Sequence, residues 1–163
     1  MKKIKTSNSN SIYVSVDDED FETLNKYIWH TSWDKNVKNY YVKRHFLKKE
    51  NKKGTTTIHR VILNAPKGMC VDHINGNTLD NRRSNLRLVT NKQNSWNFRK
   101  FSNNTTGYKG VSFCKEKKKF QSYIRVSGKQ IHLGFFDIAS EAAFVYNSAA
   151  NKYFGEFARL NLV

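Results

Sequence analysis

Residues 70–94, CVDHINGNTLDNRRSNLRLVTNKQN, decide the fold of the central part of this chain. Two short apolar runs, residues 69–74 and 86–90, have the composition and length of β-strands. The segment between them, residues 75–85, is rich in Asn, Gly and Asp, which favour turns. Residues 91–100 follow as a helix. We therefore predict the order strand, polar loop, strand, helix, and we expect Asn77 and Asn81 to act as turn formers in the loop.

The start of this helix has a specific signal. Thr90 precedes it as a candidate N-cap, and Gln93 stands three residues later. A Thr and a Gln at this spacing form a capping box, in which each side chain bonds to the backbone N–H of the other residue. The capping box predicts that the helix begins directly after Thr90.

The same stretch contains side chains suited to phosphodiester hydrolysis. This reaction needs a base that activates water and a divalent cation that neutralises charge on the phosphate. His73 is the candidate base, because an imidazole titrates near neutral pH. Asp72 and Asn94 offer hard oxygen ligands of the kind that Mg²⁺ prefers. If the helix packs back on the two strands, Asn94 approaches Asp72 and His73, and Asn85 supports the loop between the strands.

The charge of the chain indicates a nucleic-acid partner. The 163 residues include 29 Lys and Arg against 13 Asp and Glu, a net charge of +16. The excess is distributed, since residues 1–57, 58–100 and 101–163 each have a net charge of +5 or +6. An evenly spread positive charge suits a protein that neutralises phosphates over an extended footprint. We expect double-stranded DNA as the partner, bound by a protein for which a monomer is plausible.

Cysteine usage argues against a structural zinc site. Cys70 and Cys114 are the two cysteines, and they form no CxxC pair. Zinc bound by Cys70 with His45 or His59 would require ligand spacings unlike those of known zinc sites. We therefore expect Mg²⁺, with Mn²⁺ as a possible substitute, and no zinc.

The chain has no apolar stretch of about 18 residues, the length that crosses a membrane. Its first residues, MKKIKTSNSNS, contain lysines but lack the apolar core of a secretory signal. The expectation is a cytoplasmic protein of a phage or its bacterial host, without a membrane partner.

The flanking segments have different patterns. In the first segment, which runs from about residue 12 to residue 64, we predict strands at 11–16 and 40–46. Residues 17–29 are predicted as an acidic turn that leads into a helix, and a short helix is predicted before Pro66. These elements bury little by themselves, so we expect them to form a scaffold. Residues 102–106 are polar and predict a linker between a domain at 1–101 and one at 107–163.

The second domain is predicted as three antiparallel strands packed on one helix. YKGVSF, KFQSYIRV and KQIHLGFF have strand patterns, and the last two are separated by a tight turn at Ser127-Gly128. The helix covers 140–154, with alanines and tyrosines on one face. In residues 120–126, Phe120, Ser122, Ile124 and Val126 alternate with Gln121, Tyr123 and Arg125. The first set is suited to packing under the helix and the second to contacting DNA.

Residues 58–98 resemble the HNH branch of the His-Me finger nucleases, and especially small homing endonucleases of phages and bacteria. The resemblance implies a ββα-metal core, with His73 as general base, Asp72 and Asn94 as metal ligands, and Asn85 as the residue that braces the loop. His59 matches a histidine often found just before this motif. Arg82 and Arg83, in the loop, are candidate DNA contacts.

Residues 107–162 resemble the plant ethylene-response-factor domain, also called the Apetala-type domain, through GYKGV, YIRV, HLGFFD and FGEFARLN. That resemblance implies a sheet that enters the major groove of DNA. The positions that match its contact sites are Lys109, Ser112, Tyr123, Arg125 and His132, to which strand alternation adds Gln121. His132 replaces a tryptophan of the plant domains, so a base preference cannot be carried over.

Together these features predict an α+β protein that is a site-specific, metal-dependent DNA endonuclease, of the homing type found in mobile elements. The alternative is a DNA-binding regulator whose nuclease motif is inactive. The presence of Asp72, His73, Asn85 and Asn94 together favours the enzyme. RNA binding is a third reading, but the chain lacks the aromatic motifs of common RNA-binding modules.

Overall fold

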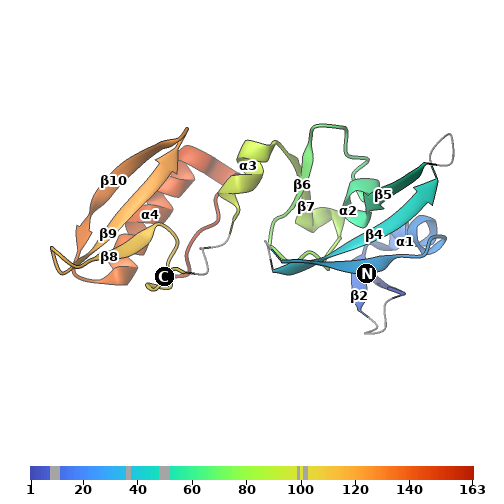
Figure 1. Cartoon of the computed structure of the whole chain (residues 1–163), viewed down its shortest axis with the longest axis horizontal. Coiled ribbons are helices and arrows are strands. Elements are labelled where there is room, and N and C mark those ends of the chain that lie inside the picture. The colour runs from blue at the N-terminus through green and yellow to red at the C-terminus, as the bar shows by residue number, and fades with distance from the viewer. Residues whose placement is uncertain (8–11, 36–37, 48–51, 99, 101–102) are drawn as a thin grey trace. The chain divides into compact units, whose positions relative to one another are not determined.

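The computed structural model mixes short helices with small antiparallel sheets, which confirms the predicted α+β class. It divides into two compact units, Met1–Asn94 and Ser95–Val163 (Figure 1). Among the described residues, no helix has the length and apolar character needed to cross a membrane. The structure describes residues 1–7, 12–35, 38–47, 52–98, 100 and 103–163.

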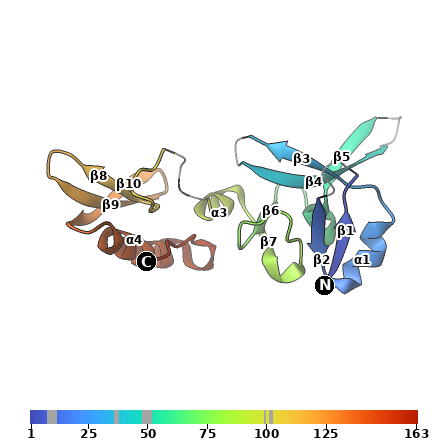
Figure 2. The ribbon, with the colours of Figure 1, turned by 90° about the horizontal axis from the view of Figure 1, so that it is seen from below.

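The first unit begins with a two-stranded ribbon and a helix (Figure 2). These elements are β1 (Lys2–Lys5), β2 (Tyr13–Val16) and α1 (Asp18–Asn25). Three acidic residues occupy the first turn of α1, where the helix dipole favours negative charge. A three-stranded sheet in the order β3-β4-β5 and a short helix follow: β3 (His30–Asp34), β4 (Asn39–Leu47), β5 (Lys53–Thr57) and α2 (Ile58–Ile62).

The first unit ends with the strand, loop, strand and helix that the central stretch predicts. These elements are β6 (Cys70–His73), the 3-10 turn η2 (Arg83–Asn85), β7 (Leu86–Val89) and α3 (Asn91–Trp96). The capping box is confirmed, since the N–H of Thr90 donates to the Gln93 side chain and the N–H of Gln93 to the Thr90 hydroxyl. The helix is shorter than predicted and ends at Trp96.

One hydrophobic core joins these parts of the first unit. It contains residues of the ribbon, α1, the sheet, α2 and β7: Ile4, Val14, Val16, Leu24, Trp29, Val42, Ile58, Ile62 and Leu86. The N-terminal segment and the central stretch therefore fold as one unit. A short ribbon or hairpin is only marginally stable in water, which is why the ribbon and the β6-β7 pair need this shared core.

The second unit has a three-stranded antiparallel sheet in the order β10-β9-β8, with α4 against it. Its elements are β8 (Val111–Cys114), β9 (Lys119–Val126), β10 (Lys129–Phe136), α4 (Ala139–Phe154) and the 3-10 turn η3 (Gly155–Phe157). Ser127 and Gly128 both have positive φ and connect Val126 to its partner Lys129, which confirms the two-residue turn.

Burial along β9 follows the predicted alternation. Ser122 and Ile124 are buried, and Ile124 packs with Tyr146 and Ala150 of α4. Arg125, which points the other way, is exposed. The apolar face of α4 differs from the prediction at one position. Tyr153, expected on that face, is 40% exposed, and the neighbouring Phe154 is buried instead.

The predicted linker at 102–106 is placed only in part. Phe101 and Ser102 lie outside the described residues. Asn104 and Thr106 hydrogen-bond to backbone oxygens of the second unit. Trp96, which precedes the predicted linker, stacks on Phe154 at 4.8 Å between ring centroids. The units thus separate between Asn94 and Ser95, and a functional boundary at 102–106 stays a prediction.

Gly110 is a position where the second unit should not tolerate a side chain. Its φ is +75°, and a Cβ there would meet the Tyr146 ring at 2.0 Å. We expect Gly110→Ala to lower the free energy of unfolding of this unit by at least about 2 kcal/mol, from overpacking and left-handed strain.

Gly128→Ala is the matched control for this prediction. Gly128 has a φ of +82°, but a Cβ there would have nothing within 4 Å, so only the backbone strain is added. Urea unfolding of both variants measures the difference. Equal losses of stability would contradict the proposed contact with Tyr146.

Candidate active site

The polar loop between β6 and β7 is held by the N-terminal strands of its own unit. The backbone of Ser15 in β2 accepts a hydrogen bond from Asn81 and donates one to Leu79. Asn39 of β4 donates to the Gly76 carbonyl at 3.2 Å, and the Thr78 hydroxyl donates to the Tyr40 carbonyl. The N-terminal elements thus hold the loop in place.

His73, at the end of β6, is buried, and its Nε2 is hydrogen-bonded to Asn81. It is 5% exposed, and its Nε2 lies 3.1 Å from Oδ1 of Asn81. Asn81 has no exposed surface, and its Nδ2 donates to the Thr78 carbonyl at 2.9 Å. This second bond orients the amide, so its oxygen faces His73. Because an amide oxygen only accepts, Nε2 of His73 carries the hydrogen and Nδ1 carries the lone pair of the neutral ring.

Burial is the main influence on the charge state of His73, and it lowers the pKa of the imidazole below its usual value. The bond to Asn81 and the carboxylates of Asp72 and Asp80 act in the opposite direction. The balance favours a neutral ring near pH 7. A neutral imidazole is the form that can accept a proton.

Asp72 stands directly opposite Arg87 in the β6-β7 register. Arg87 donates to Oδ2 of Asp72 from Nε at 2.9 Å and from Nη2 at 2.7 Å. Both side chains are largely buried, with 8% of Asp72 and 14% of Arg87 exposed. The pair thus sets a guanidinium against a carboxylate directly beside His73 in a buried place.

Asn85 connects the two ends of the loop. Its Oδ1 accepts from the N–H of Asn75 at 3.0 Å, and its Nδ2 donates to the Asp80 carbonyl at 2.8 Å. Its own carbonyl accepts from the N–H of Ile74. These bonds fix the backbone immediately after His73.

Asn94 completes the first turn of α3, and its N–H bonds to the Thr90 carbonyl. The start of this helix is tied to β6, because the Cys70 thiol donates to Oδ1 of Asn91 at 2.8 Å. The structure thus brings Asp72, His73 and Asn85 together and places Asn94 in the adjoining helix. Carboxylate and amide oxygens of this kind fit a hard divalent cation, and a carboxylate has about four acceptor sites, so Arg87 does not use the whole group.

His59 lies next to His73. The two ring centroids are 5.1 Å apart and nearly perpendicular, and Nε2 of His59 lies 2.8 Å from the Thr57 hydroxyl. Burial, followed by the nearby His73 and Arg60, lowers the pKa of His59 to about 3. His59 therefore stays neutral over the pH range in which proteins are stable.

This shift predicts a pH dependence of stability. The unfolded chain binds a proton at His59 below pH 6.5, but the folded chain binds it only near pH 3. Above pH 6.5, His59 therefore causes no loss in the free energy of unfolding. Below pH 6.5, and down to about pH 3, that free energy falls by about 1.4 kcal/mol for each pH unit. His59→Gln should remove this part of the slope, measured by urea unfolding at several pH values. Parallel curves for the two proteins would contradict it.

In the second unit, five predicted DNA contacts share one face of the sheet. Ser112 pairs with Gln121 and His132 with Tyr123 across the strands, and cross-strand partners point to the same side. Gln121 donates to the Ser112 hydroxyl at 2.9 Å, and the His132 ring contacts Phe135 at 4.5 Å. Arg125 extends this face, which is opposite to the face that packs on α4.

Lys109 does not share that face. Its ammonium donates to the Trp96 carbonyl at 2.6 Å, within the second unit. Burial and then the charge of Arg159 lower the pKa of Lys109 to about 8. Lys109 thus caps the C-terminal end of α3, where a cation is favourable.

Arg82 and Arg83 are both in ion pairs within the first unit. Arg82 pairs with Asp80 at 2.6 Å, and Arg83 with Asp20 at 2.7 Å and Glu19 at 2.9 Å. A phosphate would have to share or replace these carboxylates.

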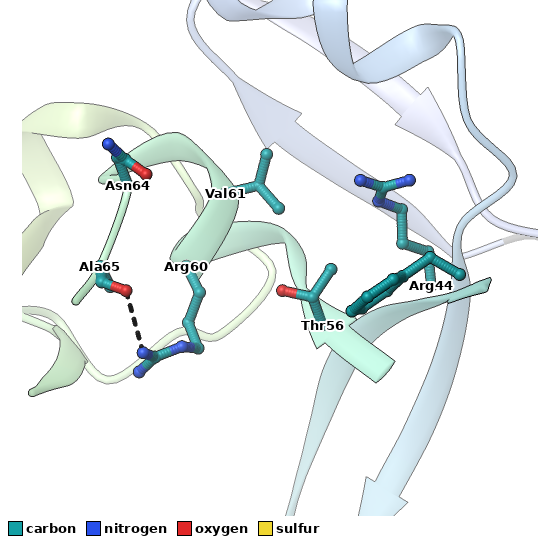
Figure 3. A pocket seen from close by; sticks show the side chains of 7 residues that line it. Arg44, Thr56, Arg60, Val61, Asn64 and Ala65 are labelled. Carbon is teal, nitrogen blue, oxygen red and sulfur yellow. Dashed lines mark hydrogen bonds between the residues drawn. The ribbon is translucent and has the colours of Figure 1, made fainter. Parts of the chain in front are cut away.

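A pocket of about 350 Å³ lies elsewhere in the first unit (Figure 3). No residue predicted to be catalytic or metal-binding lines it. Its two arginines are engaged, since Arg60 donates to the Ala65 carbonyl at 3.0 Å and Arg44 lies over the Tyr27 ring at 3.8 Å. The residues that line it are Arg44, Phe46, Thr56, Arg60, Val61, Asn64 and Ala65.

Sequence reasoning missed two residues of the site. Asn81 was expected only to form a turn, but its buried amide also bonds to His73 as well as to the Thr78 carbonyl of the loop. Asn77 does act as a turn former, since its Oδ1 accepts from the N–H of Leu79. Arg87 was not considered, although pairing of residues 69–74 with 86–90 could have placed it opposite Asp72.

Parts of the chain are similar to known proteins. A family model described as HNH endonuclease matches residues 58–96. Protein 3.8 of Escherichia phage T7 is 38% identical over 94 residues, which are 58% of this chain and 77% of that protein. An uncharacterised HNH endonuclease of Acanthamoeba polyphaga mimivirus is 33% identical over 116 residues, 68% of this chain and 59% of that protein.

The C-terminal part is similar to plant proteins. An AP2-like ethylene-responsive transcription factor of Arabidopsis thaliana is 43% identical over 56 residues, 34% of this chain and 12% of that factor.

Residues 58–96 thus belong to the HNH endonuclease family.

Proposed function

We propose that this chain is a site-specific DNA endonuclease of the homing type, which hydrolyses phosphodiester bonds with one divalent metal ion and a histidine base. The observation that carries the proposal is the buried His73, whose Nε2 is held by Asn81 beside the Asp72–Arg87 pair. The other ring nitrogen, Nδ1, then bears the lone pair that accepts the proton of the attacking water.

Asp72 and Asn94 are the residues that would hold the metal ion. When bound, a divalent cation such as Mg²⁺ neutralises charge on the phosphate and on the leaving oxygen, and Mn²⁺ can substitute. The donor set supports a hard cation, because both residues offer oxygen. Asn85 has a supporting role, through bonds to the backbone on both sides of the loop.

The second unit is proposed as an Apetala-type DNA reader. Its exposed sheet face has the hydrogen-bonding side chains that contact base edges and phosphates: Ser112, Gln121, Tyr123, Arg125 and His132. Lys109, whose ammonium bonds to the Trp96 carbonyl, is proposed to stabilise the unit. Arg82 and Arg83 would reach phosphates beside the cut by exchanging their carboxylate partners.

Incubation with supercoiled plasmid DNA and Mg²⁺ tests the proposal. Nicked or linear DNA that is absent with EDTA is the expected result. Binding without any cleavage, across plasmids that contain varied sequence, would instead favour the second candidate, a DNA-binding regulator with an inactive nuclease motif.

Asn81 provides a finer test of the base. Asn81→Ala removes the acceptor that fixes the ring of His73, so single-turnover cleavage should slow by about 10–100-fold, while affinity for DNA in EDTA stays the same. The ¹⁵N shifts of the His73 ring should report loss of the preferred Nε2–H form. Asn77→Ala, in the same loop but exposed, is the control. Equal effects of the two changes would argue against this role of Asn81.

A further inference from the structure

The three-stranded sheet of the first unit has one face packed on the core and one face turned away from it. Thr31, Val42 and Gly54 are buried on the core side. The opposite side, called here the outer face, has polar side chains from all three strands. Leu47 is an exposed apolar member of this face. All its members follow from the strand register: His30, Ser32 and Asp34 of β3, Asn39, Tyr41, Lys43, His45 and Leu47 of β4, and Lys53, Thr55 and Thr57 of β5.

We propose that the outer face binds the phosphate backbone of the DNA duplex next to the bond that is cut. The inference rests on the proposed function, because a scissile phosphate at His73 requires the duplex to continue past it. It adds a second DNA-binding surface to the one in the C-terminal unit, and it gives the N-terminal sheet a role beyond scaffolding.

The outer face is continuous with the catalytic histidine through ring contacts. The Tyr41 ring lies 6.0 Å from that of His59, which lies 5.1 Å from that of His73. The Thr57 hydroxyl, on the same face, bonds to His59. A duplex positioned at His73 would therefore meet this face directly.

The chemistry of the outer face suits phosphate oxygens. Lys43 provides an ammonium group, Ser32, Thr55 and Thr57 provide hydroxyls, and His45 provides a ring nitrogen. Side chains of these types make most contacts with DNA phosphates. The His30 and His45 rings stack at 4.7 Å between centroids, and His45 also bonds to the Thr55 hydroxyl at 3.1 Å, so these three side chains hold one another in place.

Charge and length also match a duplex. Lys52 and Lys53, just before and at the start of β5, are both exposed cations. On the face itself, Asp34 is the acidic member among the described residues, at the end of β3. From Tyr41 to Lys53, the face extends along the strand by about 20 Å at the usual rise per residue. A duplex presents a phosphate of each strand roughly every 3.4 Å along its axis, so several phosphates fit.

The core side of the same strands is less suited to binding phosphates than the outer face. Arg44, which alternates with Lys43, is held over the Tyr27 and Trp29 rings at 3.8 and 5.7 Å. Lys43 instead donates to the Ser32 hydroxyl at 3.3 Å, on the outer face. Because side chains alternate along β4, Arg44 packs on aromatic rings on the core side, whereas Lys43 lies beside hydroxyl groups on the outer face.

The test is the salt dependence of DNA binding by the full chain. The double variant Lys43→Gln/Lys53→Gln is compared with Lys5→Gln/Lys26→Gln, which removes the same charge from exposed positions on β1 and after α1. Binding to a mixed-sequence duplex is measured in EDTA over a range of salt. If each lysine of the outer face neutralises one phosphate, the log–log slope decreases by about 1.8 and affinity falls roughly 30-fold at physiological salt.

The control pair should change the slope by well under one. Equal slopes for the two double variants would overturn the proposal. A photo-crosslinking residue in place of the exposed His45 offers a measurement that does not depend on the lysine variants. It should crosslink to the duplex, whereas the same residue in place of Lys26 should not, and the reverse result would also overturn it.

The outcome can be separated from that of the proposed nuclease. Binding in EDTA needs no chemistry, and cleavage by the unaltered protein is measured separately in Mg²⁺. A protein that binds through the outer face but never cuts contradicts the nuclease and supports this surface. A protein that cuts but shows no effect of the outer-face lysines contradicts this surface alone.

Discussion

His73→Ala should abolish DNA cleavage while leaving DNA binding almost unchanged. A general base contributes about 10²–10⁴-fold to the rate but little to affinity, so the loss should appear in single-turnover cleavage at saturating protein. The variant leaves Asn81 in place and opens a space between Asn81 and His59. Added imidazole should therefore restore part of the rate.

The controls for this prediction are a duplex-binding curve in EDTA and a thermal melt. Both should match those of the unaltered protein closely enough to exclude unfolding as the cause. Near-normal cleavage by His73→Ala would refute the assignment of the base, and the DNA-binding regulator would then explain the chain better.

Asp72→Ala should cause two separable losses. Cleavage should fall by at least about 100-fold, because a proposed metal ligand is removed and a bound cation contributes several kcal/mol to such reactions. Stability should also fall, by about 3–5 kcal/mol, since the largely buried guanidinium of Arg87 is left without its carboxylate.

A double variant distinguishes the two roles of Asp72. Asp72→Leu/Arg87→Met replaces both charges by apolar groups, which often leaves stability near its original value. Urea unfolding should therefore recover while cleavage stays absent at any Mg²⁺ concentration. If cleavage recovers together with stability, Asp72 serves only to pair with Arg87 and holds no metal ion.

The central motif was predictable because its signals are local. The capping box of Thr90 and Gln93 needs only two side chains at a fixed spacing, and both bonds are present. The turn at Ser127-Gly128 and the alternation of Ser122, Ile124 and Arg125 are also local, and the structure agrees with them. Such patterns depend on backbone geometry that is shared by all proteins.

Three N-terminal strands escaped prediction. β1 has one apolar residue, Ile4, among lysines; β3 is largely polar; and β5 consists of Lys, Gly and threonines. None has a strong pattern of its own. They become strands because β2 and β4 supply hydrogen-bonding partners and the core buries Ile4. Strand formation of this kind depends on neighbours more than on intrinsic preference.

The sequence by itself identified the proposed reacting groups, which are an Asp-His pair at the end of a strand and an asparagine in a capped helix. It also indicated the alternating strand of the C-terminal part. Tertiary structure alone decided how those groups are held. Asn81 has the composition of a turn residue, but docking of the loop on Ser15 directs its amide to His73. Arg87 meets Asp72 only through the register of β6 and β7. The chemistry of a polar side chain limits the hydrogen bonds that it can make. Its actual partner depends on which distant segments the folded core brings beside it.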